Sequence, residues 1–192
     1  MRLREKGKRT DGRYEMPEKT DRRNRQQLEI SVVQGSILEV NAAVIVNAAN
    51  SLGIMGGGVA GVIKRAAGAE VEEEARRHAP IPVGRAVLTS EGKTRYQHII
   101  HAPTMPAPAM RIPPQNVAVA TRAALSLADQ SGLTSLAIPG MGTGVGGVAH
   151  ADAASLMIKE IRAYAPHNLK AVVLVDVDPA MIAAWRKELA RQ

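Results

Sequence analysis

The sequence contains no cysteine and no phenylalanine, and aromatic residues of all kinds make up only 2% of its 192 residues. The absence of cysteine excludes disulfides, thiol nucleophiles and cysteine-ligated zinc. The shortage of aromatic rings means that a nucleotide-binding site in this protein has to work with little stacking. The His, Asp and Glu residues show no metal-ligand spacing, so we expect neither a metal site nor a resident cofactor.

Long apolar stretches are also missing, since no run approaches the ~18 residues that span a membrane. The N-terminus carries charges without an apolar segment after them, which is unlike a signal peptide. We therefore expect a cytoplasmic protein with no membrane partner.

The formal net charge of +7 is unevenly distributed along the chain. Residues 1–27 hold ten Lys and Arg against five Asp and Glu, whereas residues 28–192 hold fifteen against thirteen. Residues 1–27 also lack a helical or strand period, so we expect a flexible basic extension there and one domain over residues 28–192. The extension is either a solvated tail or an arm that makes weak contact with nucleic acid.

From residue 28 onward, short apolar runs alternate with longer amphipathic or alanine-rich stretches. The apolar runs predict strands over residues 28–33, 42–46, 86–90, 96–101, 133–138 and 171–177. The longer stretches predict helices over residues 59–67, 69–78, 115–130, 149–164 and 179–190. Five prolines predict a loop over residues 102–114. This alternation indicates an α/β fold, a three-layer α/β/α sandwich around a mixed, mostly parallel central sheet of about six strands.

Glycine is concentrated in two predicted loops, with five of the seventeen glycines in Gly53–Gly61 and five more in Gly140–Gly147. Each loop follows a predicted buried strand and precedes a predicted helix. That arrangement offers bare backbone N–H groups and a helix N-terminus to an anion. One such loop is often only a tight turn, but two in matching positions favour a site for a pyrophosphate.

Gly142, Gly144 and Gly147 also fit the pattern G-x-G-x-x-G of dinucleotide-binding Rossmann proteins. That fold needs an acidic residue at the end of the next strand, about 20 residues further on. Glu160 has this spacing but lies in a predicted helix, and Asp176 ends a strand too far along the chain. The Rossmann interpretation is therefore the less favoured alternative.

Two asparagines follow the strand that precedes the first glycine loop, in the segment Asn47-Ala48-Ala49-Asn50. A neutral amide offers donors and an acceptor to ribose hydroxyls without repelling a phosphate. We predict that Asn47 turns the chain at the strand exit and that Asn50 meets the ligand. His101, at the end of another predicted strand, is either an acid–base group or, more simply, an imidazole bonded to backbone.

Three further features have structural interpretations. Asp178 precedes a proline at the start of a predicted helix and is expected to be its N-cap. The charged residues between 70 and 77, which are Glu70, Glu72, Glu73, Glu74, Arg76 and Arg77, are expected to form a solvent-exposed helix face. Trp185 is expected in the core.

Three segments together resemble the macrodomain family: Asn47–Asn50, the stretch Gly56-Gly57-Gly58-Val59-Ala60, and the stretch Gly142-Thr143-Gly144-Val145-Gly146-Gly147. The resemblance extends from about Leu28 to Leu189. Macrodomains bind ADP-ribose, and some remove it from acidic side chains or deacetylate O-acetyl-ADP-ribose. The resemblance therefore implies ADP-ribose or an ADP-ribosylated protein as the partner.

The resemblance also implies the residues that hold the ligand. Asn50 would contact the distal ribose and help to place a catalytic water, while the two glycine loops would lie against the pyrophosphate. Ile37 would line the adenine pocket. The complete set of implied ligand contacts is Ser36, Ile37, Ala48, Asn50, Gly57, Gly58, Val59, Pro139, Gly142, Thr143, Gly144, Val145, Gly146, Gly147 and Val177.

The chain departs from the family pattern in ways that bear on affinity and catalysis. Ser36 replaces the usual adenine-binding carboxylate, and Gly146 and Val177 stand where many members carry aromatics. Ala60 and Met55 stand where two hydrolase branches carry Asp and His. We therefore expect modest affinity and slow hydrolysis, through a water held by Asn50 and activated by the substrate's own phosphate. The alternative is a binding module without chemistry.

Overall fold

A six-stranded sheet runs through the part of the chain that the computed structural model describes, residues 27–191. Its spatial order is β1-β6-β5-β2-β4-β3, and β3 alone runs antiparallel to its neighbour. This confirms the predicted mixed, mostly parallel sheet. The strands are β1 (Glu29–Gln34), β2 (Val44–Asn50), β3 (Val87–Thr89), β4 (His98–Met105), β5 (Ser135–Ile138) and β6 (Ala171–Asp176). The predicted extension over residues 1–27 lies outside the described residues, apart from Gln27.

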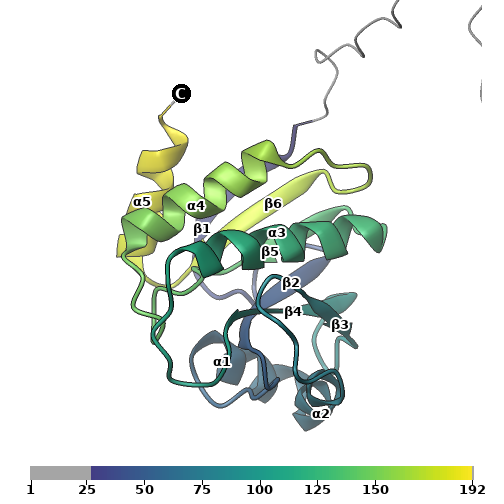
Figure 1. The fold of residues 1–192 in the computed structure, drawn as a ribbon. Coiled ribbons are helices and arrows are strands. Elements are labelled where there is room, and N and C mark those ends of the chain that lie inside the picture. The colour runs from purple at the N-terminus through teal and green to yellow at the C-terminus, as the bar shows by residue number, and fades with distance from the viewer. Residues whose placement is uncertain (1–26, 192) are drawn as a thin grey trace, which may run out of the picture.

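Within the described residues, five helices are present. They cover the two faces of the sheet (Figure 1). They are α1 (Gly58–Ala67), α2 (Ala69–Arg77), α3 (Gln115–Gln130), α4 (His150–Ala163) and α5 (Pro179–Leu189). The helices α3, α4 and α5 pack on one face, and α1 and α2 lie on the other. The three-layer sandwich is therefore confirmed. None of the helices between residues 27 and 191 is long and apolar enough to cross a bilayer.

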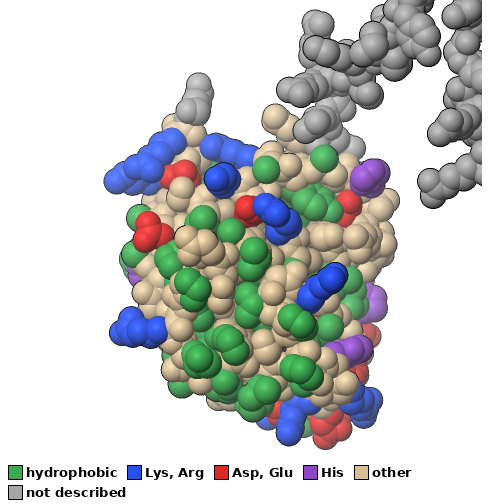
Figure 2. Space-filling view, viewed as in Figure 1, with side chains coloured by type: hydrophobic (Ala, Val, Ile, Leu, Met, Phe, Trp, Pro, Cys, Tyr) green, Lys and Arg blue, Asp and Glu red, His purple; other side chains and the backbone are tan. Residues whose placement is uncertain are grey.

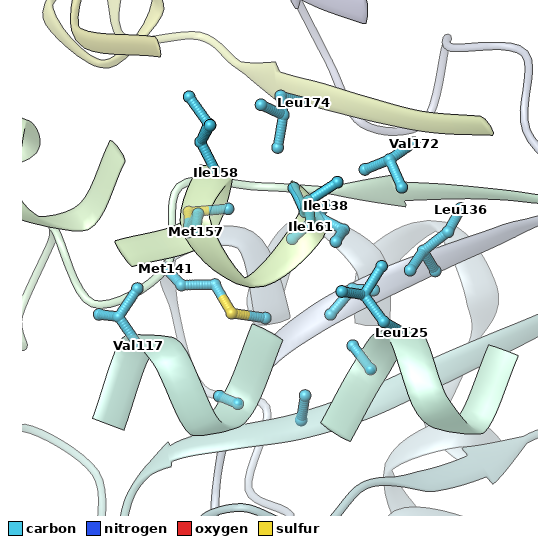
Figure 3. Close-up of a cluster of buried hydrophobic side chains, with 14 of the residues drawn as sticks. Val117, Leu125, Leu136, Ile138, Met141, Met157, Ile158, Ile161, Val172 and Leu174 are labelled. Carbon is cyan, nitrogen blue, oxygen red and sulfur yellow. The ribbon is translucent and has the colours of Figure 1, made fainter. Parts of the chain in front are cut away.

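Alternation along the strands divides the core into two halves. Val44 and Val46 of β2 face α3 and α4, whereas Ile45 between them faces α1. In the larger half, Met141 lies between Val117 of α3 and Met157 of α4 (Figure 3). The flexible thioethers of the two methionines fill space that an aromatic ring takes in many cores. Trp185 is completely buried in the same half, as predicted.

Two central strands are longer than the sequence predicts. β2 continues through Asn50, and β4 continues to Met105 across Pro103, in a segment predicted to be a loop. β3 pairs with β4 only as far as His101, so Pro103 lies where β4 has a strand neighbour on one side only. A register shift between Ala49 and Asn50 then leaves Thr104 without a partner on β2 and pairs Asn50 with Met105. These extensions carry Asn50 and Met105 to the edge of the sheet where the glycine loops lie.

Candidate functional site

A crevice of about 790 Å³ opens along the carboxyl ends of the parallel strands. Residues that follow β1 and β6 line one end, Pro139 and Gly140 after β5 line the middle, and the ends of β2 and β4 line the other. Both glycine loops contribute to its walls. This is the place where open α/β sheets bind ligands.

The first glycine loop presents bare backbone at the start of α1. The N-cap of α1 is Gly57, whose backbone is extended and whose position supplies no side-chain cap. The helical hydrogen bonds begin with the Gly61 N–H, which donates to the Gly57 carbonyl at 3.0 Å. The N–H groups of the preceding first turn therefore have no partner within the helix. The residues of this turn, Gly58, Val59 and Ala60, line the crevice.

The second glycine loop folds on itself and leaves donors free. The Gly147 N–H donates to the Gly144 carbonyl at 3.1 Å, and the Val148 N–H donates to the Gly142 carbonyl at 3.0 Å. Within residues 27–191, the backbone N–H groups of Thr143, Gly144 and Val145 have no protein acceptor. The two loops thus place two sets of unpartnered N–H groups in one crevice.

The structure requires glycine at residue 142 but not at residue 144. Gly142 has a φ of +73°, and a Cβ there would lie 2.9 Å from Ile112 Cδ1 and 3.0 Å from Val117 Cγ2. Protein packing and backbone conformation therefore both require glycine at residue 142. A Cβ on Gly144 would meet no protein atom within 4 Å and would point into open space. Neither packing against the protein nor backbone conformation therefore requires glycine at residue 144.

Carboxylates behind the glycine loops hold them in place. Glu72 accepts from the Met55 N–H at 2.7 Å and pairs with Lys64 Nζ at 2.5 Å. Burial raises the pKa of Glu72, but the bonds from Lys64 and Met55 outweigh this and lower it overall. Behind the second loop, Asp176 Oδ2 accepts from the Gly140 N–H at 3.0 Å.

The predicted solvent-exposed face over residues 70–77 is therefore wrong for two of its glutamates. Glu72 and Glu74 are half-buried. Glu74 accepts from both the N–H and the hydroxyl of Ser90, at 2.8 and 2.6 Å. The local sequence pattern of this helix is that of a solvated surface. It does not reveal the partners of the two glutamates, because Met55 and Ser90 lie 16 residues or more away along the chain.

The prediction that Asn47 turns the chain at a strand exit is also wrong. Asn47 lies inside β2, buried, with Nδ2 at 3.1 Å from His101 Nδ1 on the neighbouring strand. His101 Nε2 lies 3.0 Å from Thr89 Oγ1. The imidazole is thus bonded to side chains rather than to backbone, in the interior of β4 rather than at its end. Because His101 is completely buried and does not line the crevice, nothing favours an acid–base role.

Asn50 lines the crevice and also shapes the segment before the first glycine loop. Its Oδ1 accepts from the N–H groups of Leu52 at 3.1 Å and Ile54 at 3.2 Å. Its Nδ2 donates to the Ile54 carbonyl at 2.7 Å. One amide hydrogen is left for a ligand. This local role was not foreseen from the sequence, and the catalytic role of Asn50 stays a prediction.

The other implied ligand contacts also line the crevice, with the exception of Gly147. Its N–H is used within the loop, and a Cβ there would collide with Arg111 instead of facing the crevice. Sequence reasoning missed the wall formed by the proline-rich segment after β4, because such segments carry no residue-specific signal. The lining residues that were not predicted include Thr104, Met105, Pro108, Ala109, His150, Asp176 and Asp178.

Charged side chains are scarce around this crevice. Within residues 27–191, the lining includes no Lys or Arg, and its ionisable members Asp176, Asp178 and His150 lie together at the β6 end. Two exposed apolar side chains, Val145 at 63% and Val177 at 70%, flank the crevice. On the face shown in Figure 2, charged side chains are most frequent near the top and the bottom, and isolated Lys or Arg side chains also lie within the hydrophobic and uncharged surface between them. No group of His, Asp and Glu within the described part of the chain could hold a metal ion.

The buried histidine makes folding stability depend on pH. Burial lowers the pKa of His101 from 6.5 to about 4, although the Glu74 carboxylate opposes this. Between these values the unfolded chain binds a proton that the folded protein does not. The free energy of unfolding should therefore fall by about 2 kcal/mol from pH 7 to pH 5, as urea denaturation at both values would measure. His101→Gln should remove most of this fall, and an equal fall in the variant would contradict the assignment.

The chain matches known proteins both in sequence and in fold. The sequence model of the Macro domain family matches residues 46–157, a range that contains both glycine loops. An uncharacterized protein of Aquifex aeolicus is 57% identical over 162 residues, which cover 84% of this chain and 98% of that protein. An Oceanobacillus iheyensis macrodomain solved with ADP matches with a TM-score of 0.76 at 26% identity, covering 86% of this chain and 92% of that one. A Trypanosoma brucei macrodomain solved with ADP-ribose matches with a TM-score of 0.75 at 25% identity, covering 84% of this chain and 69% of that one.

Proposed function

Since this chain belongs to the Macro domain family, we propose that it binds ADP-ribose in the crevice at the carboxyl ends of its strands. The observation that carries the proposal is the presence of two sets of unpartnered backbone N–H groups in a crevice whose described lining includes no Lys or Arg. Fixed N–H dipoles bind a pyrophosphate without the strongly hydrated charges of Lys and Arg. They also add little long-range attraction for unrelated anions such as nucleic acid.

The order of the strand ends suggests how the ligand lies. The pyrophosphate sits between the two glycine loops, and the distal ribose sits at the β2 and β4 end beside Asn50. The adenine sits at the β1 and β6 end, against Ile37 and Val177. Ile37 is buried and Val177 is exposed, so aliphatic packing takes the place of an aromatic ring at this end.

Titration calorimetry with a series of ligand fragments tests this arrangement. We expect affinity to fall in the order ADP-ribose, ADP and AMP, because each step removes a group that the crevice contacts. Loss of the second phosphate should have the largest effect, about ten-fold or more, because it removes hydrogen bonds to a charged group. Equal affinity for AMP and ADP would be incompatible with a pyrophosphate held by paired loops.

We also propose that the protein slowly hydrolyses ADP-ribosyl esters, on acidic side chains or in O-acetyl-ADP-ribose. The residues at the distal end of the crevice are uncharged, and they include Asn50, Ile54, Thr104, Met105 and Pro108. No general base is therefore at hand at this end of the described lining. A water held by Asn50 would pass its proton to a phosphate oxygen of the bound substrate, and water would be added across the ester to release ADP-ribose and the acid. Positioning alone would supply the rate enhancement.

A timed single-turnover assay separates this enzyme from a binding module without chemistry. The protein is mixed in excess with O-acetyl-ADP-ribose, and release of acetate is followed beside buffer and beside a binding-deficient variant, Gly144→Val. We expect release faster than in either reference. Hydrolysis that matches buffer, with intact ligand binding, would leave the binding module as the function.

A further inference from the structure

Two side chains with spare hydrogen-bonding capacity meet at the β6 end of the crevice. His150, the first residue of α4, places Nε2 at 2.9 Å from Oδ2 of Asp178, the N-cap residue of α5. Both line the crevice, and their side chains are 36% and 44% exposed. The pair therefore joins the start of α4 to the start of α5 within reach of a ligand.

Asp176 and Ser36, the other polar side chains considered at this end, also form hydrogen bonds within the protein. Asp176 accepts from the Gly140 N–H with one oxygen and from the Asp178 N–H, at 2.9 Å, with the other. Ser36 Oγ accepts from the Leu38 N–H at 3.2 Å, which leaves its hydroxyl hydrogen as a free donor. Asp178 Oδ1 accepts from the Ala180 N–H at 2.8 Å, and Oδ2 faces His150. Each carboxylate oxygen has a second lone pair, so Asp178 can accept further bonds on its exposed side.

We propose that Asp178, held in place by His150, selects a nucleobase that carries an amino group on its exposed edge. The inference rests on the proposed function, because it assigns this end of the crevice to the base. A carboxylate only accepts hydrogen bonds, so it favours an N–H₂ group and disfavours a carbonyl at the same position. The Ser36 hydroxyl adds a donor for a ring nitrogen that carries no hydrogen.

Adenine offers this combination, with an amino group beside an unprotonated ring nitrogen. Hypoxanthine carries a carbonyl in place of the amino group, and its adjacent ring nitrogen carries a hydrogen. It therefore offers an acceptor where adenine offers a donor, and a donor where adenine offers an acceptor. His150 acts as a positioning residue here. Its Nε2–H bond fixes the Asp178 carboxylate, and without that bond the side chain can turn away from the base.

The test compares ADP-ribose with its hypoxanthine analogue, inosine-diphosphate-ribose, by titration calorimetry. We expect the wild-type protein to prefer ADP-ribose about ten-fold, the size of one hydrogen bond to a charged group. Asp178→Asn keeps the N-cap, because asparagine caps helices as well as aspartate does. It introduces an amide donor where the carboxylate accepts. The preference should therefore shrink to about two-fold or less, or reverse.

Two further variants complete the experiment. His150→Ala should lower the preference for ADP-ribose without weakening the hypoxanthine analogue, which a general loss of folding would not do. Asp152→Asn, on the exposed first turn of α4, should leave both affinities unchanged. A ten-fold preference that persists in Asp178→Asn would overturn the inference, and so would equal binding of both ligands by the wild-type protein. In either case the proposed function would stand, whereas binding of neither ligand would remove both.

Discussion

Replacing Gly144 with valine should weaken ADP-ribose binding about 100-fold or more and change the free energy of unfolding by less than about 1 kcal/mol. A Cβ at residue 144 meets no protein atom within 4 Å, so the folded protein has room for the side chain. Its backbone φ also lies outside the left-handed region that favours glycine. The added methyl groups instead occupy the space in which a pyrophosphate would contact the Thr143–Val145 backbone.

Gly132 provides a matched control with the opposite expected outcome. It also has no neighbour within 4 Å of a built Cβ, but its φ is +73° and it lies just beyond the end of α3, away from the crevice lining. Gly132→Val should therefore cost about 1–2 kcal/mol of stability through backbone strain and leave ADP-ribose affinity unchanged. Calorimetric titration and urea denaturation of both variants measure the two effects. Unchanged affinity in Gly144→Val would show that the second glycine loop does not hold the ligand.

The elements of this fold could be predicted because their signals are local. The apolar runs around Val44–Val46 and Val172–Val175 identify buried strands without knowledge of their neighbours, and Gly68 marks the boundary between α1 and α2. The ends of β2 and β4 could not be predicted in this way. Asn50 and Pro103 discourage strand assignment locally, and they belong to strands only because of how the adjacent strands pair.

The same distinction explains which parts of the site were found. Glycine density and the order of motifs identified both loops, since each signal lies within a few residues. The contacts that hold the site are long-range. Asn47 and His101 are 54 residues apart in sequence, and Gly140 and Asp176 are 36 apart. A side chain's partner at such separations depends on strand order, which composition and periodicity do not specify.

Asp129 is the clearest case of a residue whose importance only the fold reveals. It lies near the end of α3 and is 4% exposed. Its carboxylate accepts from the backbone N–H groups of His167, Asn168 and Leu169, at distances from 2.6 to 3.1 Å, and from the Tyr164 hydroxyl at 3.2 Å. It therefore anchors the segment that leads into β6, at the end of the sheet opposite the crevice.

These bonds keep Asp129 ionised although it is buried. Burial raises its pKa, but the hydrogen bonds from Leu169, Asn168, His167 and Tyr164 together lower it from 3.8 to about 2. A folded-state pKa below the unfolded one contributes stability that is fully present above about pH 4 and is lost as the pH falls towards 2. At neutral pH the shift corresponds to about 2.5 kcal/mol.

Asp129→Asn should lower the free energy of unfolding by about 3 kcal/mol at pH 7 and the melting temperature by about 6–12 °C. The amide has nearly the same shape, but it loses the charge and turns an N–H₂ group towards backbone donors. Asp152→Asn, an exposed change of the same chemistry, should stay within about 0.5 kcal/mol of wild type. At a temperature where the variant is folded, Asp129→Asn should bind ADP-ribose like the wild-type protein, because the anchor is remote from the crevice. Loss of binding without loss of stability would mean that the two ends of β6 are coupled in a way that these contacts do not explain.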